Sequence, residues 1–173
     1  MSLSIGEVKM TGFAQYLPAI LDRPINVENY SKTYENNRHH VYSLAFWMTD
    51  NELAAEALMT QTFCRAFAAS PEPTADDIDR ALIVELRDCM DLGTFTLNCA
   101  PCDRVLSVRR NTMRVDLERA VVQLPNTEKM IFLMHDVECY DHVQIARLLN
   151  ISEEASVHGL HQARLRMREL LVK

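Results

Sequence analysis

Glycine is scarce in this chain, and neither long apolar runs nor alternation of apolar and polar residues occurs. Only 4 of the 173 residues are glycine, while alanine, leucine, methionine, glutamate and arginine are plentiful, a composition that favours helix. The missing alternation and the few turn dipeptides give no sign of strands. Because no apolar run reaches about 18 residues, no transmembrane helix is expected. The sequence therefore predicts an all-α protein.

Signals for export, catalysis and cofactor binding are also missing. No basic region followed by an apolar stretch opens the chain, so a cytoplasmic protein is expected. Neither a glycine-rich phosphate loop nor a GxSxG motif occurs. His39 and His40 are adjacent on an expected helix and would point about 100° apart, unlike a chelating i, i+4 pair. We expect no enzymatic activity, no cofactor and no metal.

The five cysteines do not form a recognisable framework. Cys99 and Cys102 make a lone CxxC motif, whereas a structural zinc site needs four ligands. A thioredoxin-like redox pair would need a βαβ context, which is absent. We interpret the pair as ordinary linker cysteines, with metal binding or a redox response as the alternatives.

Charge is distributed unequally along the chain. Residues 1–103 hold 7 basic and 15 acidic residues, a net charge of −8, whereas residues 104–173 hold 11 and 9, a net charge of +2. The total of −6 argues against a general nucleic-acid binder. The C-terminal part is therefore the better candidate for meeting phosphates.

Helical periodicity and its interruptions predict two helical domains. Apolar stripes over about 27–48, 52–69 and 75–92 predict a small bundle. Asp50 or Asn51 is expected to cap the second helix, and Thr74 with Asp77 resembles a capping box at the third. The expected parts are an N-terminal extension at 1–27, a helical domain at 28–92, a linker at 93–113 and a second helical domain at 114–173.

The strongest local pattern is a helix-turn-helix within "QIARLLNISEEASVHGLHQARLRMREL". In the second domain, helices are expected at about 114–123, 127–137, 141–149 and 153–171, with Asn126 or Thr127 capping the second of them. Ser152 is expected to cap the last helix. Such corners occur in many helical proteins that do not bind DNA. The inward-facing residues should be Ile145, Ala146, Leu149, Leu160 and Ala163.

Two stretches resemble the sigma-70 family of RNA polymerase sigma factors, of the extracytoplasmic-function (ECF) type. The C-terminal one, "LPNTEKMIFLMHDVECYDHVQIARLLNISEEASVHGLHQARLRMREL", is similar to region 4 of that family. The upstream one, "ENNRHHVYSLAFWMTDNELAAEALMTQTFCRAF", is similar to region 2. The order and the spacing of the two also agree, and the resemblance covers most of residues 28–171.

The resemblance implies a non-catalytic subunit that directs transcription initiation. In the family, region 2 docks on the β′ subunit of core RNA polymerase and opens the −10 element. Region 4 packs on the β subunit and places its last helix in the major groove of the −35 element. The implied partners are core RNA polymerase, promoter DNA and an anti-sigma factor, with no membrane insertion.

The candidate site residues follow from this resemblance and from the chemistry of base recognition. The polymerase-facing candidates are Glu56, Gln61 and Arg65, for which solvated helix positions are the alternative. Amide and imidazole groups can read base edges, and arginine can contact phosphate or guanine. The DNA-facing candidates on the last helix are Ser156, His158, His161, Gln162 and Arg164.

Departures from the family pattern suggest weakened DNA binding. Each lost phosphate contact flattens the salt dependence by about 0.9, and a central glycine costs about 1 kcal/mol of helix propensity. Two alternatives therefore stay open: a degenerate sigma-like regulator that binds an anti-sigma factor or polymerase without productive promoter recognition, and an unrelated helix-turn-helix repressor. The family's acid, Gln and Glu are replaced by Ala57, Thr60 and Gln61, the Glu of "EIA" by Gln144, and often-basic positions by Val157, Gly159 and Gln162.

Overall fold

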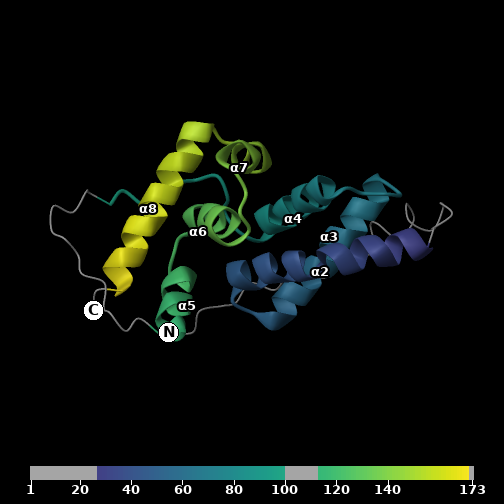
Figure 1. Ribbon diagram of the computed structural model, residues 1–173, viewed down its shortest axis with the longest axis horizontal. Helices are drawn as coiled ribbons and strands as arrows, with labels where there is room; N and C mark the ends of the chain where they lie inside the picture. The colour runs from purple at the N-terminus through teal and green to yellow at the C-terminus, as the bar shows by residue number, and fades with distance from the viewer. Residues whose placement is uncertain (1–26, 100–112, 172–173) are drawn as a thin grey trace. The chain divides into compact units, whose positions relative to one another are not determined.

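The computed structural model describes residues 27–99 and 113–171, and within these ranges every regular element is helical (Figure 1). The prediction of an all-α chain is thereby confirmed. The chain divides into two compact units between Cys89 and Met90. Apart from Val27, the expected N-terminal extension lies outside the described residues. No helix in the described ranges is long and apolar enough to cross a membrane.

The described part of the first unit is a bundle of three helices. They are α2 (Val27–Thr49), α3 (Glu52–Ala69) and α4 (Ala75–Cys89). Each buries one apolar stripe against the other two, as the periodicity predicts. The core residues are Val41, Leu44, Ala45, Met48, Ala55, Leu58, Phe63, Ala66, Phe67, Ile78, Ala81, Leu82, Ile83 and Leu86.

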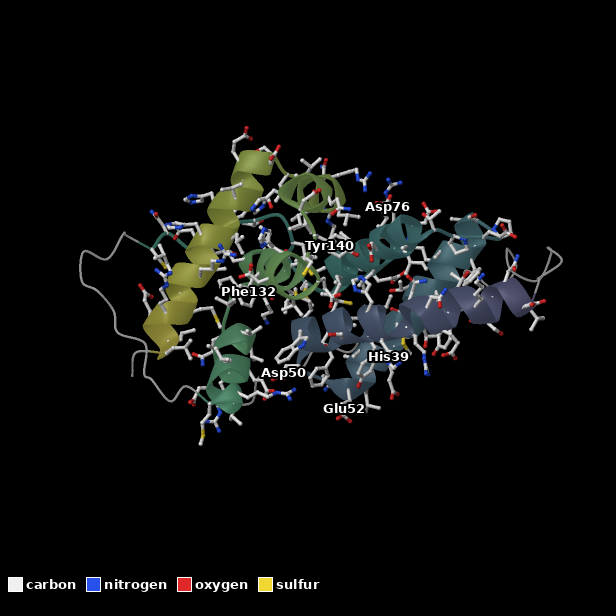
Figure 2. The ribbon with its side chains drawn as sticks, viewed as in Figure 1. His39, Asp50, Glu52, Asp76, Phe132 and Tyr140 are labelled. Atoms are coloured by element: carbon white, nitrogen blue, oxygen red, sulfur yellow. The ribbon has the colours of Figure 1, made fainter. Side chains whose placement is uncertain are left out.

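Short polar residues start the second and third helices of this bundle. The side chain of Asn51 accepts a hydrogen bond from the Ala54 amide at 2.9 Å, which makes Asn51 rather than Asp50 the cap of α3. Asp77 and Thr74 form the expected reciprocal pair at α4: Thr74 Oγ1 accepts from the Asp77 amide and Asp77 Oδ2 accepts from the Thr74 amide. Asp76 lies in the same first turn, where the helix dipole favours acids (Figure 2).

Aromatic and ionic contacts join the helices at the edge of the core. Tyr30 and Tyr34 on α2 pack against Phe67 and Phe63 on α3, with ring centroids 4.6 and 4.9 Å apart. His40 Nε2 lies 2.9 Å from the buried carboxylate of Asp79 on α4.

The adjacent histidine of α2 has a different environment. His39 is exposed (Figure 2).

Among its described residues, the second unit contains five helical pieces and a core of its own. They are α5 (Arg114–Val122), α6 (Asn126–Phe132), a π-helical turn η1 (Leu133–Val137), α7 (His142–Leu149) and α8 (Glu153–Leu171). The π-helical turn continues α6 directly and was not expected. The core residues of the second unit are Ala120, Val121, Leu124, Met130, Ile131, Leu133, Met134, Ile145, Ala146, Leu148, Leu149, Leu160, Ala163 and Met167.

Residues 93–99, here called the strap, lie against the second unit rather than running free. The strap precedes the undescribed residues 100–112 and forms the first part of the expected linker. Its Gly93 amide donates to Thr127 Oγ1 at 3.0 Å. Thr127 therefore binds the strap instead of capping α6, and Asn126 does not cap it either, because the N-cap position belongs to Pro125 and has no side-chain cap.

Candidate nucleic-acid interface

The helix-turn-helix is fixed by two polar caps and one left-handed residue. Asp141 Oδ1 accepts from the Gln144 amide at 2.7 Å, and Gln144 Oε1 accepts from the Asp141 amide at 3.1 Å. Asn150 ends α7 with φ of 52°, a conformation that asparagine tolerates. Ser152 Oγ accepts from the Ala155 amide at 3.1 Å and starts α8, as predicted. Gln144 thus keeps a capping role at the position where the family has Glu.

The two helices of the motif share one buried face. Ile145, Ala146 and Leu149 of α7 and Leu160 and Ala163 of α8 are all buried, which confirms the inward-facing set. The opposite face of α8 is exposed. Its exposed residues include Glu154, Val157, His158, His161, Arg164 and Arg168.

The five DNA-facing candidates separate into two groups. His158 and His161 are exposed, and the Arg164 side chain keeps 49% of its surface. Ser156 and Gln162 are buried inside the unit. DNA contact by all five stays a prediction, and for these two it would require the side chain to leave its buried position.

Arg164 is held by Asp136, which lies in the π-helical turn. Its Nη2 and Nε donate to Asp136 Oδ1 and Oδ2 at 2.6 and 3.0 Å, a two-bond pair of the geometry that arginine favours. Burial opposes ionisation of Asp136, but hydrogen bonds from Arg164 and His135 outweigh it and lower the pKa of the carboxyl. An exposed cation of α8 is therefore already partly neutralised within the domain.

Two histidines complete this polar network of His135, Asp136, His142, Ser156 and Arg164. The imidazoles of His135 and His142 stack with centroids 4.6 Å apart. His142 Nδ1 lies 3.0 Å from Ser156 Oγ, and His135 Nδ1 lies 2.8 Å from Asp136 Oδ1. The network thus links η1, α7 and α8. No sequence signal pointed to His135, Asp136 or His142, because the turn that gathers them departs from α-helical periodicity.

Burial lowers the pKa of His142, and the neighbouring His135 lowers it further. Arg164 acts in the same direction, while Glu153 and Asp141 oppose it. The folded domain therefore favours the neutral imidazole at this position.

Gly159, the glycine in the middle of α8, lies under the strap. A Cβ added there would meet Phe95 Cε1 at 2.6 Å and Ile131 Cδ1 at 2.7 Å. Both distances are too short for carbon–carbon contact, so the missing side chain makes room for the Phe95 ring. The expected weak point of the helix is a packing site for the strap.

The polymerase-facing candidates lie on α3 of the first unit. Glu56 is exposed and Gln61 is half-buried. Arg65 Nε donates to the buried Glu85 of α4 at 2.6 Å, and its Nη2 lies 3.7 Å from Asp88. Arg65 therefore ties α3 to α4 whether or not it also faces a partner. Binding of polymerase by these residues stays a prediction.

Cys99 lies in the strap, whereas Cys102, its partner in the CxxC motif, lies outside the described residues. Burial raises the pKa of the Cys99 thiol, and Glu169 adds to the effect. A raised pKa disfavours the thiolate that metal binding and redox exchange require. Elsewhere in the described ranges, no group of three or more potential metal ligands gathers.

Residues 114–167 match the family model described as sigma-70, region 4. The part of the second unit from α5 into α8 is therefore similar to region 4 of the sigma-70 family and is here called region 4. The match starts at α5 and ends within α8, so it includes the whole helix-turn-helix. It confirms the resemblance to the sigma-70 family by sequence over region 4, a DNA-binding helix-turn-helix domain of transcription initiation.

The fold of most of the chain is similar to that of a solved sigma factor. That structure is the co-crystal of the sigma factor RpoE with the anti-sigma factor NepR from Bartonella quintana. The TM-score is 0.62 at 14% sequence identity, and the likeness covers 83% of this chain and 97% of the other. No curated protein matches the chain in sequence. Outside residues 114–167, the likeness to that sigma factor is therefore one of fold.

Proposed function

We propose that the chain is an ECF-type sigma factor that binds core RNA polymerase and directs it to particular promoters. The observation that carries the proposal is the region 4 domain, whose helix-turn-helix is capped, packed and open along one face of α8. A role in transcription initiation follows from that domain type. Promoter choice and polymerase binding are the finer parts of the proposal.

In this proposal the two units have separate tasks. The bundle of α2, α3 and α4 acts as region 2, contacts the β′ subunit through the α3 surface around Glu56 and Gln61, and engages the −10 element. Region 4 contacts the β subunit and presents His158, His161 and Arg164 to the −35 major groove. Both units hold one enzyme, so each can bind weakly and still give a tight complex. The site of action is the cytoplasm, where core polymerase works on DNA.

A run-off transcription assay tests the proposal. The full chain is combined with core polymerase and a randomised promoter library, and templates that yield defined transcripts are enriched. We expect a shared motif near −35 and another near −10. A preparation that binds polymerase but starts no transcript on any enriched template would contradict promoter direction. Arg164→Glu should lower transcription without unfolding the domain, because this side chain is half-exposed.

A second candidate function is a sigma-like regulator that sequesters a partner without reading promoters. The observation that favours it is the engagement of three of the five DNA-facing candidates inside the domain: Ser156 with His142, Gln162 with the strap and Arg164 with Asp136. The similar RpoE structure contains an anti-sigma factor, and we extend the proposal to an anti-sigma partner for this chain. Tight binding of such a partner, without polymerase-dependent DNA binding, would support the regulator.

A further inference from the structure

Three side chains of region 4 bind the backbone of the strap in a row. Thr127 Oγ1 accepts from the Gly93 amide, Glu128 Oε1 accepts from the amides of Thr96 and Leu97 at 2.9 and 2.8 Å, and Gln162 Oε1 accepts from the Cys99 amide. All three acceptors are buried. Because they bind amides rather than strap side chains, the row recognises the backbone of the strap.

An aromatic contact adds to this backbone recognition. The Phe95 ring packs over Gly159 of α8 and beside Ile131 of α6. The groove, defined here as Thr127, Glu128, Ile131, Gly159 and Gln162, thus combines polar acceptors with a slot for one ring. Two of its five residues belong to the helix that we propose reads DNA.

We propose that this groove is a docking site for the strap, and that strap docking and simultaneous binding of the −10 and −35 elements exclude each other. The inference rests on the proposed function. Its structural basis is the short chain between the docked strap and the first unit. Helix α4 ends at Cys89 and the first docked amide belongs to Gly93, so only Met90, Asp91 and Leu92 lie between them.

The length of the tether between the two units limits how far apart they can bind DNA, and it differs between the docked and the released state. Elements centred at −10 and −35 are 25 base pairs apart, or about 85 Å at 3.4 Å per base pair. A unit of this size has a diameter of about 30 Å, and the short joint reaches at most about 14 Å. Docked, the unit centres can separate by about 45 Å, which is half of what is needed. When the strap is released, the tether between the units comprises residues 90–113 and can span about 80 Å. The two units can then reach both promoter elements.

Release also changes the groove itself. In the docked state, Glu128 is fully buried and its Oε2 has no hydrogen-bond partner among the described protein groups. A buried carboxylate oxygen without a partner disfavours the docked state and so favours release. Release would also free Gln162, which then becomes available to the −35 groove.

Amide hydrogen exchange in the full-length chain tests this proposal. Residues 93–99 are followed in the free chain, with core polymerase, and with polymerase on promoter DNA. We expect slow exchange of Thr96, Leu97 and Cys99 in the free chain and at least about tenfold faster exchange in the promoter complex. Unprotected amides in the free chain would overturn docking. Amides that stay protected in the promoter complex would overturn the exclusion.

Two variants sharpen the test. Phe95→Ala removes the ring from its slot and should speed exchange of the strap about tenfold and tighten promoter binding several-fold, because less of the chain is docked. Asn98→Ala is the matched control, since Asn98 is an exposed strap residue. Equal exchange rates of the strap amides in the two variants would contradict a role of the Phe95 ring in docking. A circular dichroism melt of each variant shows whether faster exchange comes from strap release or from unfolding of the domain. A chain that forms no promoter complex overturns the proposed function and the exclusion together, while strap docking is still decided in the free chain.

Discussion

Several residues of region 4 have packing or hydrogen-bonding roles that their residue types alone do not indicate. Glycine is unfavourable in the middle of a helix, yet Gly159 leaves room for the Phe95 ring. Gln144 departs from the family's Glu and still completes a capping box with Asp141. Gln162 looks like a base-reading amide and instead accepts a strap amide. For Gly159 and Gln162, neighbours distant in sequence decide the role.

Replacing Gly159 with alanine should destabilise region 4 by about 1 kcal/mol. Alanine gains about 1 kcal/mol of helix propensity, but forcing a methyl group against Phe95 and Ile131 costs about 1–3 kcal/mol. Urea unfolding measures the difference. The loss should shrink in a Phe95→Ala background, where only the mobile end of Ile131 must shift. A stabilising Gly159→Ala in the natural background would contradict the packing role.

Substitutions of Asp136 and of Arg164 should change DNA binding in opposite directions. Asp136→Asn should strengthen DNA binding in the polymerase complex and steepen its salt slope by about 0.9, because it frees one cation for a phosphate. Arg164→Gln should weaken binding and flatten the slope by a similar amount. Titrations of labelled promoter DNA at several salt concentrations measure both. If Asp136→Asn weakened binding instead, Asp136 would be orienting Arg164 rather than competing with DNA for it.

Most elements could be predicted from the sequence, and the exceptions have physical reasons. Apolar periodicity and capping residues marked α2, α3, α4, α7 and α8, because these helices bury one stripe in a local core. The π-helical turn was not foreseen, since it has neither a 3.6-residue stripe nor a cap. Strap docking was also missed, because it depends on backbone amides and carries no periodic pattern. Among the DNA-facing candidates, the burial of Ser156 and Gln162 was not foreseen either, because it depends on segments distant in sequence.

The link between η1, α7 and α8 should make region 4 sensitive to mild acid. Burial and His135 lower the pKa of His142, so the folded state favours the neutral imidazole. This contribution is complete above the ordinary pKa of about 6.5 and is lost as the pH falls below it. Asp136, whose pKa is also lowered, adds a loss only at lower pH. Thermal melts should therefore show a falling midpoint between pH 7.5 and 5.5.

His142→Gln serves as the control for this pH dependence, because glutamine cannot become charged. Its melting temperature should change less over the same range than that of the natural chain. An unchanged slope would assign the pH dependence to other groups.

The contact between α3 and α4 allows a structural role of Arg65 to be separated from polymerase binding. Arg65→Ala should destabilise the first unit by about 1–3 kcal/mol, because it leaves the buried Glu85 without this partner. Arg65→Lys should retain part of that stability. Chemical denaturation measures both. If Arg65→Ala left stability unchanged and abolished polymerase binding, the side chain would act chiefly at the partner surface.

At the scale of the whole molecule, we propose that two helical units act on one polymerase. The two units differ in charge: the first, residues 1–89, holds 7 basic and 13 acidic residues, whereas the second, residues 90–173, holds 11 of each. A unit without net charge has little DNA affinity by itself. In the proposed function, promoter binding therefore comes from joint attachment to the polymerase, which lets two weak contacts reinforce each other.

One footprinting experiment tests this account most directly. The full chain, core polymerase and an enriched promoter are combined, and protection of the DNA is mapped for the complete mixture and for each protein alone. We predict protection at both −10 and −35 in the mixture, loss of the −35 protection with Arg164→Glu, and no protection by the chain alone. Equal protection by the chain without polymerase, or no protection at either element with it, would contradict the account.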